Sequence, residues 1–266
     1  MTTTQDYIIG GGAEGKARLN VLAQVLEPFT KSLLEKNGLS PGQKLLDVGC
    51  GGGNVSRMAA QMVGNSGSVT AVDFDAKIVD LNRAEVPQLP QLHYQNISAY
   101  DITYSNEFDI AYSRFLLSHL TEPALALRNI VRSVRPGASV VIEDVLFSGH
   151  ICYPSNNAFE TYVAWYISLA RKRGQQPEIG PSLMSLLHET GLQSINFDII
   201  QPAYQEGDGK WMAYLTLARI KDGIIAEKIA GEAEVNTVLE ELKDFTNSKD
   251  SFMSLPRIFR AWGVKQ

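Results

Sequence analysis

Cysteine is scarce in this sequence, and so are the patterns that mark metal sites and membrane spans. The 266 residues include two cysteines, Cys50 and Cys152, which cannot build a disulfide framework. The four histidines show no metal-ligand spacing with these cysteines, so we expect no metal. No apolar run is long enough to span a bilayer, and residues 1–6 lack the basic start and apolar stretch of a leader peptide. These absences predict a cytoplasmic protein with no membrane partner.

An excess of basic residues is also missing. The chain has 24 lysines and arginines against 29 aspartates and glutamates, which gives a formal net charge of −5. Such a chain repels a polyanion at long range unless a basic patch outweighs the net charge. The one dense basic run, Arg171-Lys-Arg173, is typical of a solvated helix end. We therefore expect no nucleic-acid partner, and the oligomeric state stays open.

Strands and helices alternate through the first half of the chain. Strands are expected at 44–48, 68–73, 91–95, 108–112 and 139–146, with helices at 54–63, 76–85 and 123–134. A strand-helix alternation indicates parallel crossovers, and strands that are apolar on both faces indicate a sheet covered on both sides. The pattern predicts a doubly wound α/β domain with its ligand site at the carboxyl ends of the strands.

The flanking segments are predicted to be helical additions to a single domain spanning 1–266. Residues 1–42 would form an N-terminal helical cap, in which Pro28 implies two short helices or one kinked helix, and residues 43–146 would form the core. Helical insertions at 147–176 and 203–250 are placed by topology where a substrate would lie, so we expect them to act as lids. Tyr153 and Phe159 are the preferred pocket residues. Tyr162, Trp165, Tyr166 and Leu169 have the i, i+3, i+4, i+7 spacing of a buried helix face, which is an equally good interpretation.

A glycine-rich turn follows the first expected strand, with the sequence Asp47-Val-Gly-Cys-Gly-Gly-Gly53. Small residues at a strand-to-helix junction let a ligand approach the backbone and the free amides of a helix N-terminus. The dinucleotide fingerprint fails here, because Asn54 stands where its third glycine is required. Asp47 lies two residues before Gly49, where it could meet an ammonium or sulfonium group.

Asp73 ends the second expected strand, where its two oxygens can accept both ribose hydroxyls of a nucleoside. The alternative is an N-cap for the helix beginning near Ala76, a role that Asp75 could fill instead.

These residues carry a family resemblance. The segment 45–53 with Ala71-Val-Asp73 resembles the first two motifs of class I S-adenosylmethionine-dependent methyltransferases, and Gln95-Asn-Ile97, 108–114, 120–123 and Arg135-Pro-Gly137 extend the likeness. Upstream, Tyr7-Ile-Ile-Gly10 with Glu14 and Arg18 is similar to a segment that folds over the cofactor in a bacterial small-molecule subgroup.

The resemblance implies a fold, a cofactor and a set of site residues. The fold would be the Rossmann-like methyltransferase fold, a mostly parallel seven-stranded sheet with helical lid insertions. The cofactor would be S-adenosylmethionine, released as S-adenosylhomocysteine. Asp73 would take the ribose, Phe74 would lie against adenine, and Ile97 would offer its backbone amide to the ring. Asn96, which replaces the usual aspartate, would accept the adenine amino proton. Further cofactor contacts are implied for Tyr7, Arg18, Asp47, Gly49, Cys50, Gly51, Ser113 and Arg114.

The expected activity is methyl transfer to a small-molecule acceptor on an O, N or C atom. A base is needed only if the acceptor is protonated, and His119, Glu143, Asp144 and His150 stay open as candidates, with no catalytic residue assigned. Three alternatives remain: an RNA methyltransferase, an NAD-dependent oxidoreductase on a similar fold, and a non-catalytic binding domain.

Overall fold

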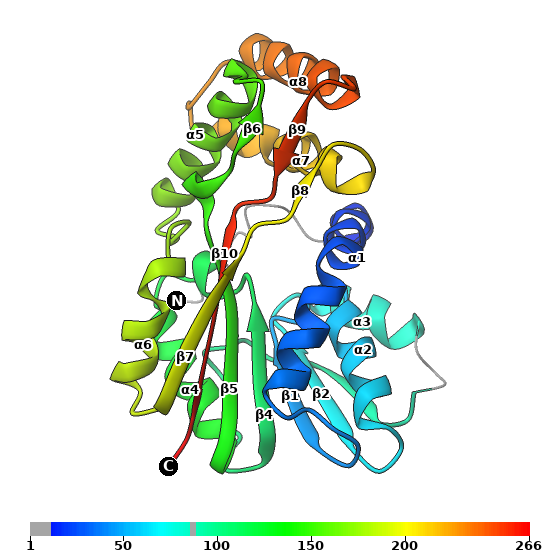
Figure 1. The fold of residues 1–266 in the computed structure, drawn as a ribbon, viewed down its shortest axis with the longest axis vertical. Helices are drawn as coiled ribbons and strands as arrows, with labels where there is room; N and C mark the ends of the chain where they lie inside the picture. The colour runs from blue at the N-terminus through cyan, green and yellow to red at the C-terminus, as the bar shows by residue number, and fades with distance from the viewer. Residues whose placement is uncertain (1–11, 86–88) are drawn as a thin grey trace.

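A seven-stranded sheet forms the centre of the protein (Figure 1). The structure, a computed structural model, describes residues 12–85 and 89–266, with side chains from Arg18 onward. The strand order is β3-β2-β1-β4-β5-β10-β7, and β10 runs antiparallel to both β5 and β7. The predicted fold class is confirmed. The strands are β1 (Lys44–Val48), β2 (Ser68–Asp73), β3 (Leu92–Asn96), β4 (Phe108–Arg114), β5 (Val134–Leu146), β7 (Gln193–Ile200) and β10 (Arg257–Val264).

Helices cover both faces of this sheet because successive strand side chains point to opposite faces. Leu45 packs into the core shared with α1 and α2, whereas Leu46 packs into the core shared with α4 and α6. From β1 the chain adds β2 and β3 on one side of the sheet, and it then crosses to the other side of β1 to add β4 and β5. The strand order thus reverses between β1 and β4, and ligands bind at such a point in open α/β sheets. The helices are α1 (Gly12–Lys36), α2 (Asn54–Val63), α3 (Ala76–Glu85), α4 (Pro123–Ser133) and α6 (Leu183–Glu189).

A second layer, residues 147–176 and 203–254, lies beyond the carboxyl ends of β5 and β7 (Figure 1). We call it the upper layer. It holds three helices and a small sheet of order β6-β9-β8: α5 (Asn157–Lys172), α7 (Met212–Ala226), α8 (Glu232–Asn247), β6 (Cys152–Tyr153), β8 (Ala203–Tyr204) and β9 (Phe252–Ser254). Leu22 and Leu26 of α1 are buried in the core of this layer, whereas Leu33 and Leu34 are buried against the large sheet. α1 is therefore common to both layers.

The small sheet continues the large one. β5 leads into β6, β7 into β8, and β9 into β10, so the order β6-β9-β8 repeats the order β5-β10-β7. Strands of two or three residues are too short to show an alternating pattern, so this small sheet has no signal in the sequence.

Of the two alternatives for the N-terminal segment, the structure has one helix, Gly12–Lys36, which contains Pro28. Arg135-Pro-Gly137, one of the segments that carry the family likeness, forms an irregular stretch within β5, with Gly137 at φ 82° and a register shift against β4. Within the described residues, no helix combines the length and the apolar character needed to cross a membrane.

Candidate active site

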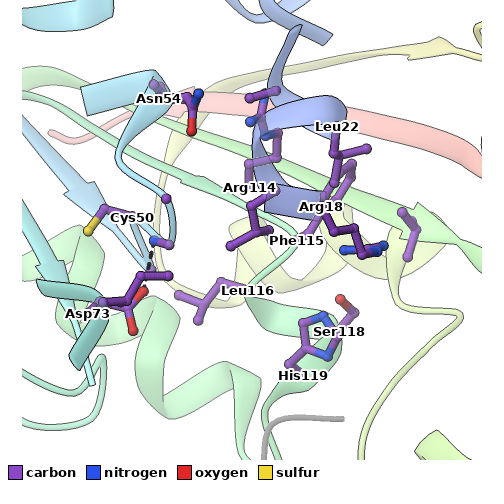
Figure 2. A pocket seen from close by; sticks show the side chains of 18 of the residues that line it. Arg18, Leu22, Cys50, Asn54, Asp73, Arg114, Phe115, Leu116, Ser118 and His119 are labelled. Carbon is purple, nitrogen blue, oxygen red and sulfur yellow. Dashed lines mark hydrogen bonds between the residues drawn. The ribbon is translucent and has the colours of Figure 1, made fainter. Parts of the chain in front are cut away.

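One cavity extends from the glycine turn to the upper layer, and α1 forms one of its walls. Figure 2 shows Asp73 and Cys50 at one side of it and Arg18, Ser118 and His119 at the other. It therefore has two parts: a half at the ends of β1 and β2, and a half under the upper layer.

The glycine turn fits a ligand that approaches the backbone. Gly49, Gly51 and Gly53 have φ values of 73°, 48° and 73°, a region that favours glycine. A Cβ on Gly49 would lie 3.0 Å from Cδ1 of Leu116, so a side chain there would also crowd the cavity. α2 begins at Asn54 without a side-chain cap, which leaves its first amides available to a ligand.

Asp73 aims its carboxylate into the first half of the cavity. Its Oδ2 accepts a hydrogen bond from the Gly51 amide at 2.9 Å (dashed in Figure 2), and its Oδ1 accepts one from the Asp75 amide at 3.0 Å. The α3 N-terminus is capped by Asp75, whose Oδ1 accepts the Lys77 amide at 2.9 Å. Burial raises the pKa of Asp73, and its backbone hydrogen bonds partly oppose that rise. The cap alternative for Asp73 therefore has no support in the structure.

The residues expected around adenine divide into two groups. Phe74 and Ile97 line the cavity, and Phe74 is 47% exposed although its ring is apolar. The Ile97 amide donates to the Asp73 carbonyl at 3.0 Å, because the β2–β3 pairing continues past Asn96, so the structure gives no support to its expected bond to the ring. Asn96 does not line the cavity: its Nδ2 donates to the carbonyls of Asp73 and Phe74, at 3.0 and 2.8 Å. Asn96 therefore holds the turn that positions Phe74.

Asp47 and Cys50 lie at the cavity floor. Asp47 is 2% exposed and its Oδ2 accepts a 2.6 Å hydrogen bond from Ser56 Oγ. Burial raises the pKa of Asp47 to about 6, although the Ser56 hydrogen bond and the nearby Arg114 charge oppose the rise. Burial also raises the pKa of the Cys50 thiol well above its usual value, so this thiol stays protonated.

Two arginine side chains line the cavity, and each donates to a threonine hydroxyl. Arg18 donates from Nε and Nη2 to Thr216 Oγ1 of α7, at 3.1 and 3.0 Å, and Arg114 donates to Thr30 Oγ1 of α1 at 3.0 Å. Ser113 is fully buried and does not line the cavity. Tyr7 lies outside the described residues.

The half under the upper layer is mainly aromatic. Phe147 stacks on Tyr166 with ring centroids 3.6 Å apart, and Tyr162 lies one helical turn before Tyr166 on α5. His119 and His150 line the same half. Burial lowers the pKa of both histidines to about 4; the Arg18 charge adds to this for His119, whereas for His150 the 2.7 Å contact of Nδ1 with the Phe147 carbonyl opposes it. Both rings are therefore neutral at pH 7.

The structure separates the four candidate bases. His119 and His150 reach the cavity, but Glu143 and Asp144 are fully buried and do not line it. Glu143 Oε1 accepts hydrogen bonds from Tyr112 at 2.7 Å and Thr30 at 2.8 Å, and Asp144 Oδ2 accepts the Ser118 amide at 3.0 Å. These carboxylates support the walls of the cavity.

The preferred pocket residues Tyr153 and Phe159 do not line the cavity, so that prediction is wrong. Tyr153 is 64% exposed on β6, where its ring stacks on Phe252, because the short strand turns it outward. Phe159 packs against the His150 ring, one layer behind the wall. Tyr162 and Tyr166 are both buried helix face and cavity wall.

Other lining residues had no signal in the sequence. Met212 and Thr216 of α7, and Leu255 and Pro256 before β10, come to the cavity only through packing of the upper layer.

Comparisons with known proteins agree with this geometry. Residues 46–142 match the family model of the methyltransferase domain. A 2-phytyl-1,4-naphtoquinone methyltransferase from Trichormus variabilis is 30% identical over 159 residues, which cover 55% of this chain and 66% of that protein, just under two thirds of its length. The O-methyltransferase resE from Aspergillus sclerotiorum is 27% identical over 227 residues, covering 81% of this chain and 78% of that one.

A solved structure shows the same fold. Phosphoethanolamine N-methyltransferase 2 from Haemonchus contortus, in complex with phosphomonomethylethanolamine and S-adenosylhomocysteine, has a TM-score of 0.55 to this chain at 16% identity, covering 94% of this chain and 58% of that one. Residues 46–142 therefore match the methyltransferase domain model, and the chain shares its fold with a methyltransferase solved in complex with S-adenosylhomocysteine.

Proposed function

We propose that this protein is a cytoplasmic enzyme that transfers a methyl group from S-adenosylmethionine to a small, partly apolar molecule. The observation that carries the proposal is one continuous cavity with a glycine turn and Asp73 at one end and an aromatic wall at the other. The acidic net charge supports a small molecule over a nucleic acid as the acceptor.

The residues of the first half fit the cofactor. Asp73 presents an ionisable carboxylate for the two ribose hydroxyls, and Phe74 offers an exposed apolar ring that a nucleobase would cover. Gly49 and Gly51 leave the backbone open, and Asp47 places negative charge below the turn. Arg18 and Arg114 are the arginines among the described lining residues, and we assign them to the carboxylate of the cofactor's methionine part. S-adenosylmethionine supplies an activated methyl group on a sulfonium sulfur.

The protein's own contribution to the reaction is positioning. Methyl transfer is an in-line displacement, which gains most from holding the nucleophile against the methyl carbon in a cavity that excludes water. We assign the core to 43–146, the cap to 1–42, and the lids to 147–176 and 203–250. The lids supply Phe147, Tyr162 and Tyr166, whose rings give the acceptor apolar area of defined shape.

The relatives support this class of acceptor. The Trichormus variabilis protein is named for a naphthoquinone, a planar ring system that carries oxygen, and the Aspergillus sclerotiorum protein is named for O-methylation.

Calorimetry with S-adenosylmethionine, S-adenosylhomocysteine and NADH tests the proposal. The two sulfur nucleosides should bind and NADH should not, because Asn54 replaces the glycine that a dinucleotide requires. Equal or tighter binding of NADH would instead favour an oxidoreductase.

A further inference from the structure

We infer that the acceptor is an uncharged planar molecule methylated on a hydroxyl oxygen, and that Nε2 of His150 accepts the hydrogen bond of this hydroxyl and then its proton. This inference rests on the proposed function, because it concerns the same cavity. We call the half under the upper layer the acceptor half, and the half at the ends of β1 and β2 the cofactor half.

The charges around the cavity argue against a cationic acceptor. The acidic residues that line it, among those whose side chains the structure describes, are Asp47, Asp73 and Asp75. All three belong to the glycine turn or the end of β2, so they lie in the cofactor half. An ammonium group under the upper layer would be desolvated with no described carboxylate to pair with, which is strongly unfavourable.

The shape of the acceptor half favours a flat molecule. Phe147 and Tyr166 lie nearly parallel, at 5° between ring planes, and Tyr162 meets Phe147 edge to face at 5.9 Å. Aromatic walls of this kind give a ring-shaped ligand offset stacking and edge contacts. Met212 of α7 also lines the cavity, with a flexible apolar side chain.

His150 is held in one tautomer. Its Nδ1 lies 2.7 Å from the Phe147 carbonyl, which only accepts, so Nδ1 carries the hydrogen and Nε2 of the neutral ring has a free lone pair. No described residue donates a hydrogen bond to Nε2. The rings of Phe147, Phe159 and Tyr162 hold the imidazole in place, with centroids 4.6 to 6.0 Å away.

His119 and His150 differ in the groups around them, although the pKa of both is lowered to about 4. The Arg18 guanidinium opposes protonation of His119, whose ring also has a hydrogen bond with the Gln175 side chain. Among the described residues, no charged side chain contributes to the lowered pKa of His150. Tyr162 of α5 is the titratable group in ring contact with His150, and burial raises its pKa to about 12, so it stays a neutral phenol. Arg18 of α1 and His119, which follows β4, line the same cavity.

The hydroxyl oxygen forms a bond to the methyl carbon while the carbon–sulfur bond breaks, and that bonding pair stays on sulfur. The hydroxyl proton goes to Nε2 of His150, and the O–H bonding pair stays on oxygen. The oxygen becomes strongly acidic as it acquires the methyl group, so a weak base is sufficient at that moment. The imidazolium then releases its proton to water.

The test measures binding of two shape-matched probes, 1-naphthol and 1-methylnaphthalene, to the protein saturated with S-adenosylhomocysteine. His150→Asn is the informative variant, because the asparagine Nδ2 can keep the hydrogen bond to the Phe147 carbonyl while the acceptor at Nε2 is lost. The ratio of naphthol to methylnaphthalene affinity should fall about tenfold in this variant, the effect of one buried hydrogen bond. S-adenosylhomocysteine affinity should stay unchanged. His119→Asn is the matched control and should keep the naphthol preference.

Two further readouts complete the test. The cationic probe 1-naphthylmethylammonium should bind more weakly than naphthol. The naphthol preference should persist from pH 7 to pH 5 and disappear toward pH 4, where His150 becomes protonated and can no longer accept. Tighter binding of the ammonium probe, or a naphthol preference that survives His150→Asn or disappears in His119→Asn, would overturn the inference. A wild-type protein that fails to bind S-adenosylhomocysteine would instead contradict the proposed function, and the inference with it.

Discussion

The carboxylate of Asp73 holds the glycine turn in place and also faces the cavity, because it accepts the Gly51 amide and lines the site with the same group. Replacing it with alanine should weaken S-adenosylhomocysteine binding by well over tenfold. Hydrogen bonds to a charged group are worth about 1.5–3 kcal/mol each and rarely add fully, so the expected loss is about 2–4 kcal/mol. Calorimetry and a melting curve on the same variant measure affinity and stability separately. A lower melting temperature with intact affinity would show that the residue is purely structural.

Asp47 gives the apo protein a pH dependence. Burial raises the pKa of Asp47 to about 6 in the folded state, against 3.8 for an ordinary aspartate, so the unfolded chain ionises first as the pH rises. Ionisation of Asp47 therefore lowers the free energy of unfolding between about pH 4 and pH 6, by at most about 3 kcal/mol. Asp47→Asn removes this loss and can keep the contact with Ser56. Urea unfolding should show the variant gaining stability over wild type from pH 4 to pH 7.

A surface carboxylate provides the control for this titration. Asp80 is 72% exposed and pairs with Arg83 within α3, so Asp80→Asn should show no comparable change over the same pH range. An Asp47→Asn difference that is flat with pH would contradict the burial argument.

At the scale of an element, α5 presents two kinds of aromatic side chain. Tyr166 lines the cavity and stacks on Phe147, whereas Trp165 is equally buried but faces the helical core of the upper layer. Tyr166→Leu should weaken 1-naphthol binding several-fold while S-adenosylhomocysteine affinity stays within about twofold, since stacked aromatic pairs are worth about 0.5–1.5 kcal/mol. Calorimetry in the presence and absence of S-adenosylhomocysteine measures both.

Trp165→Leu is the matched control on the same helix. It should lower the melting temperature through lost packing and leave the naphthol affinity of the folded protein unchanged. If both variants lose naphthol and cofactor binding equally, α5 is simply core and the acceptor lies elsewhere.

At the scale of the whole molecule, α1 packs in both layers, and three strands of the large sheet each connect directly to a strand of the small sheet. We therefore predict that the two layers unfold together. The three tryptophans report on both layers: Trp165 and Trp211 lie in the upper layer, and Trp262 lies on β10 of the large sheet. Variants that keep Trp165 alone or Trp262 alone should show coincident urea transitions by fluorescence. Separate midpoints would mean two cooperative units and would contradict a single domain over 1–266.

Most of the core fold could be predicted from the sequence because its signals are local. The apolar strands, the glycine turn and the placement of Asp73 depend on residues within a few positions of one another, and β1, β2 and α2 begin and end where their patterns indicate. Strand-helix alternation then restricts the topology to a doubly wound sheet, since parallel crossovers are right-handed and short. The class of cofactor was implied by the family resemblance that residues 45–53 and 71–73 carry together with the motifs downstream.

Which side chains line the acceptor half of the cavity depends on the tertiary structure. Tyr153 and Phe159 differ little from Tyr162 and Tyr166 in sequence, and only the outward turn of β6 and the packing of α5 separate them. The Ile97 amide and the Asn96 side chain both donate to the carbonyl of Asp73 at the end of β2, which lies 23 residues before Asn96 in the chain. The sequence by itself determined the glycine turn and the position of Asp73, because they belong to one strand-turn-helix unit and its neighbour. The tertiary structure decided which aromatic and histidine side chains line the rest of the cavity, because that depends on how distant segments pack around it.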